Sequence, residues 1–313
     1  MKKFFSFLFV FTAVLPAMAN GQLVLDDALR ATYTACVGID DELAELKKMA
    51  GINTAVTGLA TAAGAGATVT GLVKASKDAK ADQLEKILEE IEQKTKSLDP
   101  MTEVEIEVAI ADFHKDSVTK LTSSQSIKDE LAKLNKQSKN LGNWRTGLMA
   151  TSAVANVAGT VIASGNKIDG DVKTSINACK AAVVNLRSAM MQARLNGVDI
   201  SEAQHIADVC GEYDFADLSK VNTKAKGAAI SSGIGAATGV VGTIVSATAN
   251  SDNVRNDNSG GGKKKEKTLN TTANVLAGAT TAASATATVF NATQIKAIKN
   301  VAEIAEKCTG VLR

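Results

Sequence analysis

Residues 58–73 read GLATAAGAGATVTGLV, a stretch with no charged residue, no proline and no aromatic ring. It belongs to an uncharged run at 49–73, and three similar runs follow at 146–166, 227–251 and 268–295. Each run reaches the length of about 20 residues that a helix needs to cross a bilayer. Each is nevertheless poor in the large apolar residues that drive insertion and rich in Ala, Gly, Thr and Ser. The runs therefore fit either a membrane bundle or a soluble bundle of closely packed helices.

Small residues recur at every fourth position in these runs. The glycines that we expect to pack against a neighbouring helix are Gly58, Gly66, Gly159, Gly235 and Gly239. Because residues four apart share one helix face, they form a smooth strip that a second backbone can approach closely, as in a glycine zipper. Glycine in a helix interior costs about 1 kcal/mol relative to alanine, so its repeated use indicates a packing role.

The composition predicts an all-α fold. Once residues 1–19 are set aside, Pro100 is the single proline, and aromatic residues make up 4% of the chain. Few helix breakers and many helix formers favour long helices over a β-sandwich. Between the first two runs, residues 76–142 form a charged, amphipathic segment that we also interpret as helical. Its ambiguous part is VEIEVAI at 104–110, which alternates as a strand would.

The four cysteines have matching positions in the two halves of the chain. Cys36 and Cys210 each precede a first uncharged run, whereas Cys179 and Cys308 each follow a second one. We infer an internal duplication with halves at 20–197 and 198–313. Each half would be a long antiparallel helical hairpin, and the two would pack as a coiled-coil-like bundle through Ala/Gly-rich faces.

The hairpin interpretation also predicts the disulfides. Folding each half at its middle brings its two cysteines level at the open end, so we expect Cys36–Cys179 and Cys210–Cys308. An even number of cysteines in an exported chain is typical of disulfides. The alternative is four buried free thiols. Zinc is poorly supported because no two cysteines are close in the sequence.

Two charged or aromatic features lie where a run ends. The second hairpin turns within a Gly/Lys-rich tip at about 251–268, which carries Lys263, Lys264, Lys265 and Lys267. These lysines fit a solvated turn or a contact with an anionic surface. Trp144 borders the second run and fits either an anchor at a membrane interface or a cap on a bundle end.

Residues 1–19 have the features of a secretory signal peptide. Lys2 and Lys3 form a basic start, an apolar segment follows, and AMA at 17–19 fits the small-x-small cleavage rule. We therefore expect an exported protein, periplasmic or secreted, whose mature chain begins at Asn20. Removing the two lysines takes the formal net charge from +2 to 0 (2 − 2). Such a chain has no general attraction for nucleic acid, and we expect no such partner.

No catalytic, cofactor or metal site emerges from the sequence. His114 and His205 are the only histidines, and nothing places either beside a nucleophile. We therefore expect a non-enzymatic protein with no cofactor and no small-molecule substrate. Its first predicted role is structural or protein-binding, within the bacterial envelope, through a protein partner or self-association. The alternative is a helical-hairpin protein that inserts into a membrane and oligomerises, as a pore former or an integral membrane protein.

Overall fold

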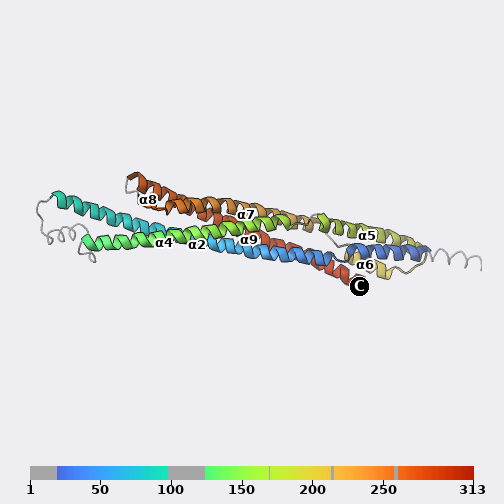
Figure 1. Ribbon diagram of the computed structural model, residues 1–313. Helices are drawn as coiled ribbons and strands as arrows, with labels where there is room; N and C mark the ends of the chain where they lie inside the picture. Colours follow the sequence, from blue (N-terminus) through green and yellow to red (C-terminus); the bar gives the residue numbers. More distant parts are fainter. Residues whose placement is uncertain (1–19, 98–123, 169, 213–214, 257–259) are drawn as a thin grey trace, which may run out of the picture. The chain divides into compact units, whose positions relative to one another are not determined.

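The computed structural model describes residues 20–97, 124–168, 170–212, 215–256 and 260–313, and it is all-helical, with no strand among them. The predicted signal peptide and the ambiguous segment at 104–110 lie outside these residues. After a first helix at 20–36, the elements follow in the order α2 (Ile39–Ser97), α4 (Ser124–Gly165), α5 (Gly170–Leu195), α6 (Ser201–Cys210), α7 (Phe215–Ala249), α8 (Asp252–Arg255) and α9 (Gly260–Leu312) (Figure 1). The longest, α2 and α9, have 59 and 53 residues.

Glycines with a left-handed backbone separate several of these helices. Gly38 has φ +94° between the first helix and α2, Gly170 has +55° at the start of α5, and Gly197 has +74° after α5. Only glycine adopts such angles without steric cost, so these positions break the helical path. The acidic first turn of α2, at Asp40 and Asp41, complements the positive end of its helix dipole.

The described chain divides into two compact units, each assembled from separate segments. We call them the disulfide unit, formed by the described residues within 1–56, 158–231 and 286–313, and the small-residue unit, formed by the described residues within 57–157 and 232–285. Each unit combines residues from both predicted halves. Compact packing does not reveal whether the sequence contains a repeat. The boundary between the two predicted halves, at residues 197 and 198, therefore stays a prediction.

The disulfide unit has an ordinary apolar core. Its fully buried large side chains come from α2, α5, α9 and the bend between α4 and α5: Ile39, Leu43, Ile168, Ile176, Leu186 and Ile298. Two disulfides cross it, Cys36–Cys179 and Cys210–Cys308, which are the pairs expected from the sequence. They join residues 143 and 98 positions apart, so each restricts a long loop of the unfolded chain.

The small-residue unit has an apolar cluster at its charged end, around Leu84, Ile127 and Leu134, but over its uncharged stretches its core consists of regularly spaced small and polar residues. Over the parts of the uncharged runs that belong to this unit, the buried positions on α7 are Ser232, Gly235, Gly239, Gly242, Ser246 and Ala249, and those on α9 are Asn270, Ala273, Ala277, Thr280 and Ser284. The spacing alternates between three and four residues, which is the heptad pattern of a left-handed coiled coil. The spacing of four residues that the sequence predicts for the packed small residues therefore describes only part of the buried face.

Candidate membrane-facing surface and its polar core

Over the uncharged stretches of the small-residue unit, large apolar side chains lie mainly on the outside. Six of them, from four helices, are 57–70% exposed: Leu59, Val69, Leu72, Val154, Ile244 and Val275. Within the uncharged parts of this unit, Met149 is the one large apolar side chain among the described residues that is fully buried. No charged residue interrupts these stretches. The outer surface of the four stretches is thus both apolar and uncharged.

The inside of the unit over these same stretches is polar and hydrogen-bonded. The Asn156 side-chain amide donates to Ser284 Oγ at 2.8 Å, and Ser152 Oγ donates to the main-chain oxygen of Ala60 at 2.7 Å. The hydroxyls of Thr238 and Thr280 are 2.9 Å apart. Asn156, Ser152 and Ser284 are fully buried. These bonds link helices to one another and satisfy groups that would be costly to bury alone.

Arg145 is the largest polar side chain in this core and is fully buried. Its guanidinium donates from Nε to Ser246 Oγ at 2.9 Å, from one terminal nitrogen to Asn274 Oδ1 at 3.0 Å, and from the other to Asn270 Oδ1 at 2.8 Å. It thereby ties α4 to α7 and α9 through three neutral acceptors. Sequence reasoning missed this centre. Its signal was an arginine at the very edge of an uncharged run and two asparagines four residues apart on α9.

A charged cluster begins where the first uncharged run ends. Lys74 is fully buried and lies 2.6 Å from Asp78 Oδ2 and 3.6 Å from Glu266 Oε1. Arg255 pairs with the same Glu266 at 3.4 Å, and Ser138 Oγ donates to Asp78. Because these ions hydrogen-bond one another, the desolvation of Lys74 is offset locally.

The lysine run near the start of α9 is only partly engaged. Lys263 donates to Glu85, and this bond raises the pKa of the lysine. Lys264, Lys265 and Lys267 are exposed. All four lysines that the sequence assigned to a turn or an anionic surface are therefore exposed, and one of them, Lys263, also pairs with Glu85.

The five glycines predicted to pack closely do not behave alike. A Cβ on Gly239 would lie 2.9 Å from Ala153 Cβ, and one on Gly235 would lie 2.9 Å from the Asn156 amide. One on Gly66 would lie 3.2 Å from Leu148 Cδ1. Gly159 is buried. A Cβ on Gly58 would meet nothing within 4 Å, so its assignment to close packing was wrong. In the first run the buried positions include Thr57, Ala60, Gly64 and Ala67, which are three or four residues apart, and Gly58 is not one of them.

One cluster among the described residues brings together side chains of the types that hold metals. The sulfurs of Cys36, Cys179 and Cys308 lie within 4.8 Å of one another. All three belong to disulfides, and a disulfide sulfur lacks the thiolate charge that binds a metal.

By length and composition alone, three helical stretches of the described chain could cross a membrane: Asn20–Glu90, Ser126–Leu195 and Leu218–Ala249. Helix α9 is not among them, although it contains the fourth uncharged run. The disulfides point to an oxidising compartment. Comparison with protein-family models, curated proteins and solved structures finds no match to this chain.

Proposed function

We propose that the chain is an exported, non-enzymatic helical protein whose small-residue unit is embedded in a lipid bilayer over its four uncharged stretches, with its charged end outside the bilayer. The observation that carries this proposal is the inverted polarity of those uncharged stretches, where large apolar side chains lie outside and polar ones inside. Val154 and Ile244 are largely exposed, while Arg145 and Asn156 are fully buried. A bundle in water gains stability by burying its large apolar side chains, and contiguous exposed apolar surface marks a membrane or protein interface.

A bilayer explains both sides of this arrangement. Lipid chains are as apolar as leucine, so outward Leu, Ile and Val side chains cost nothing there. Helices in lipid associate through small residues that allow close approach and through buried polar side chains that hydrogen-bond across the interface. Gly239 against Ala153, and Asn156 with Ser284, are contacts of these two kinds.

The finer architecture belongs to the same proposal. Each half, 20–197 and 198–313, would be one copy of a duplicated antiparallel hairpin, and Ala/Gly-rich faces would pack the hairpins together. A signal peptide at 1–19 would direct export and place the two disulfides in the periplasm or outside the cell. The unpartnered apolar surface would also allow self-association within the bilayer.

A second candidate is the soluble envelope scaffold expected from the sequence. The ordinary apolar core of the disulfide unit favours it, because Ile39, Leu186 and Ile298 are buried as in a water-soluble domain. In this case a protein partner or a second copy, rather than lipid, would cover the apolar surface.

Lysine substitutions on exposed apolar positions test the proposal. Val154→Lys and Ile244→Lys place a charge on the apolar surface, whereas Leu195→Lys changes a residue that is 85% exposed outside the uncharged runs. In a bilayer a central lysine costs about 2.5–3.5 kcal/mol. In washed membranes of an expression strain, we expect the first two variants to be at least tenfold less abundant than the parent. We expect Leu195→Lys to be as abundant as the parent.

The control separates lipid exposure from general damage. If Val154→Lys and Ile244→Lys accumulate in washed membranes as well as Leu195→Lys does, the small-residue unit is not in lipid. Equal amounts of all three variants in the soluble fraction, with unchanged helix content by circular dichroism, would support the soluble scaffold instead.

A further inference from the structure

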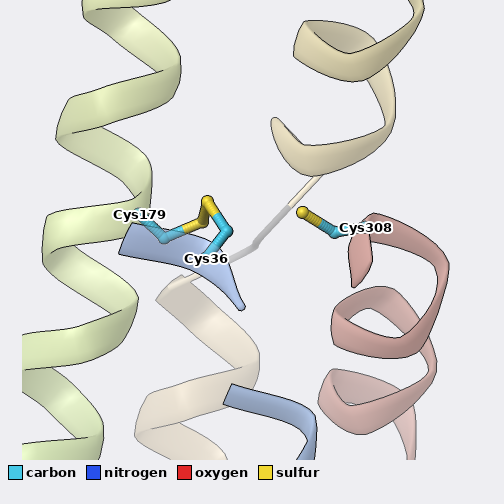
Figure 2. Close-up of side chains that lie close together, drawn as sticks. All are labelled: Cys36, Cys179 and Cys308. Carbon is cyan, nitrogen blue, oxygen red and sulfur yellow. A yellow bond between two sulfur atoms is a disulfide. The ribbon is translucent and has the colours of Figure 1, made fainter. Parts of the chain in front are cut away.

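Three sulfur atoms from two different disulfides converge in the disulfide unit. Cys36 and Cys179 are bonded to each other, and Cys308 is bonded to Cys210, yet Cys36, Cys179 and Cys308 lie within 4.8 Å of one another. Figure 2 shows the Cys308 side chain pointing from α9 toward the Cys36–Cys179 bridge. A single pairing scheme does not need the two bridges to be this close.

Sulfur atoms at this separation can exchange bonds. A thiolate attacks a disulfide through a mixed intermediate, and its rate depends on thiolate fraction and access. Holding the reactants together replaces a bimolecular encounter with a local one, which raises the effective concentration by several orders of magnitude. The three cysteines are fully buried, so a dissolved thiol has poorer access to the Cys36–Cys179 bond than Cys308 has.

We propose that Cys36, Cys179 and Cys308 form a disulfide-exchange cluster. When the bond to Cys210 is open, the Cys308 thiolate attacks the Cys36–Cys179 bond. A new S–S bond forms from Cys308 to one of these sulfurs, and the other leaves with the electron pair of the broken bond. The released thiolate takes up the proton that Cys308 gave up, so the step involves no net oxidation or reduction.

This cluster makes the chain able to correct its own pairing. A chain with one disulfide and two thiols passes its bond among the three sulfurs while it stays folded. Cys210 lies outside the group of three, and its bonded neighbour is Cys308. The two remaining thiols are then oxidised by the disulfide of a thiol-oxidising protein, which takes up two electrons and becomes a dithiol. The exchange ends once this oxidation joins Cys210 to Cys308.

The test uses the full-length Cys210→Ser variant, which leaves Cys308 as a thiol beside the Cys36–Cys179 bond. The oxidised protein is incubated near pH 8, close to the ordinary thiol pKa, then alkylated with N-ethylmaleimide, digested and analysed by mass spectrometry. We expect alkylation on Cys36 or Cys179 as well as Cys308, together with peptides that join Cys308 to one of the other two.

Cys308→Ser is the matched control, because it leaves the Cys210 thiol, which is outside the group of three. We expect at least about tenfold less alkylation of Cys36 and Cys179 in this variant. Alkylation confined to Cys308 in Cys210→Ser, or equal redistribution in both variants, would overturn the proposal.

A second measurement covers the case in which Cys210→Ser does not fold, as judged by circular dichroism. The wild-type chain is partly reduced with limiting dithiothreitol and trapped with acid. Its one-disulfide forms should then contain Cys308 paired with Cys36 or Cys179 in clear excess over Cys210 paired with either. An absence of such pairs would again overturn the proposal.

Discussion

Replacing Gly239 by alanine tests whether helix contacts in the small-residue unit depend on the absence of a side chain. The matched control is Gly58→Ala, because both glycines lie inside long helices and only one has a close neighbour. At Gly58 nothing lies within 4 Å of the added carbon. Alanine there gains its helix propensity, about 1 kcal/mol over glycine.

At Gly239 the same substitution is expected to destabilise the protein. The new carbon would lie 2.9 Å from Ala153 Cβ and 3.1 Å from its Cα, and contacting carbon atoms prefer about 3.5–4.0 Å. Neither obstructing atom can rotate away, so the helices must separate. Overpacking costs about 1–3 kcal/mol, and the propensity gain offsets about 1 of it. Gly239→Ala should therefore be about 1–3 kcal/mol less stable than Gly58→Ala.

The assay is unfolding in mild detergent followed by far-UV circular dichroism, with both variants and the parent in the same buffer. We expect the order of stability to be Gly58→Ala, parent, Gly239→Ala. A Gly239→Ala variant as stable as Gly58→Ala would show that the two backbones do not approach as described, and the packing argument would fail with it.

Three further predictions concern polar and covalent contacts. Arg145→Lys keeps the charge but cannot reach three acceptors, so it should lower the free energy of unfolding by about 2–3 kcal/mol. Removing the second bridge with Cys210→Ser and Cys308→Ser together should cost roughly 2–5 kcal/mol in thermal unfolding under oxidising conditions. A hydrogen bond from Lys139 lowers the pKa of Asp252 in the folded protein. The ionised Asp252 carboxylate therefore stabilises the fold at neutral pH, and this contribution is lost as the pH falls through the lowered pKa. Asp252→Asn should abolish this part of the acid titration of stability.

The helical class and the disulfide pairs could be predicted from the sequence for simple reasons. One proline after residue 19 leaves the chain free to form long helices, and α2 and α9 use that freedom. The pairs Cys36–Cys179 and Cys210–Cys308 follow from folding each proposed half at its middle. Both inferences use distances along the chain and need no knowledge of which helix faces meet.

The packing register could not be predicted, because the uncharged runs contain small residues on almost every face. Gly58 and Gly66 lie on one ladder as regular as the one on α7, yet only Gly66 has a close neighbour, and a helical period does not distinguish the two. The Arg145 centre needs side chains from three helices, and the approach of Cys308 to the Cys36–Cys179 bridge needs their coordinates. Contacts between distant segments decide all three features.

The most direct test of bilayer embedding is fractionation of an expression strain followed by a carbonate wash of its membranes. Carbonate releases peripheral and soluble proteins and leaves those held by lipid-exposed helices. The inverted polarity of the uncharged stretches of the small-residue unit predicts that the full-length chain stays in the washed membranes. Release of the chain into the periplasmic, culture or carbonate fraction would contradict it and would mean that protein contacts, not lipid, cover Val154 and Ile244.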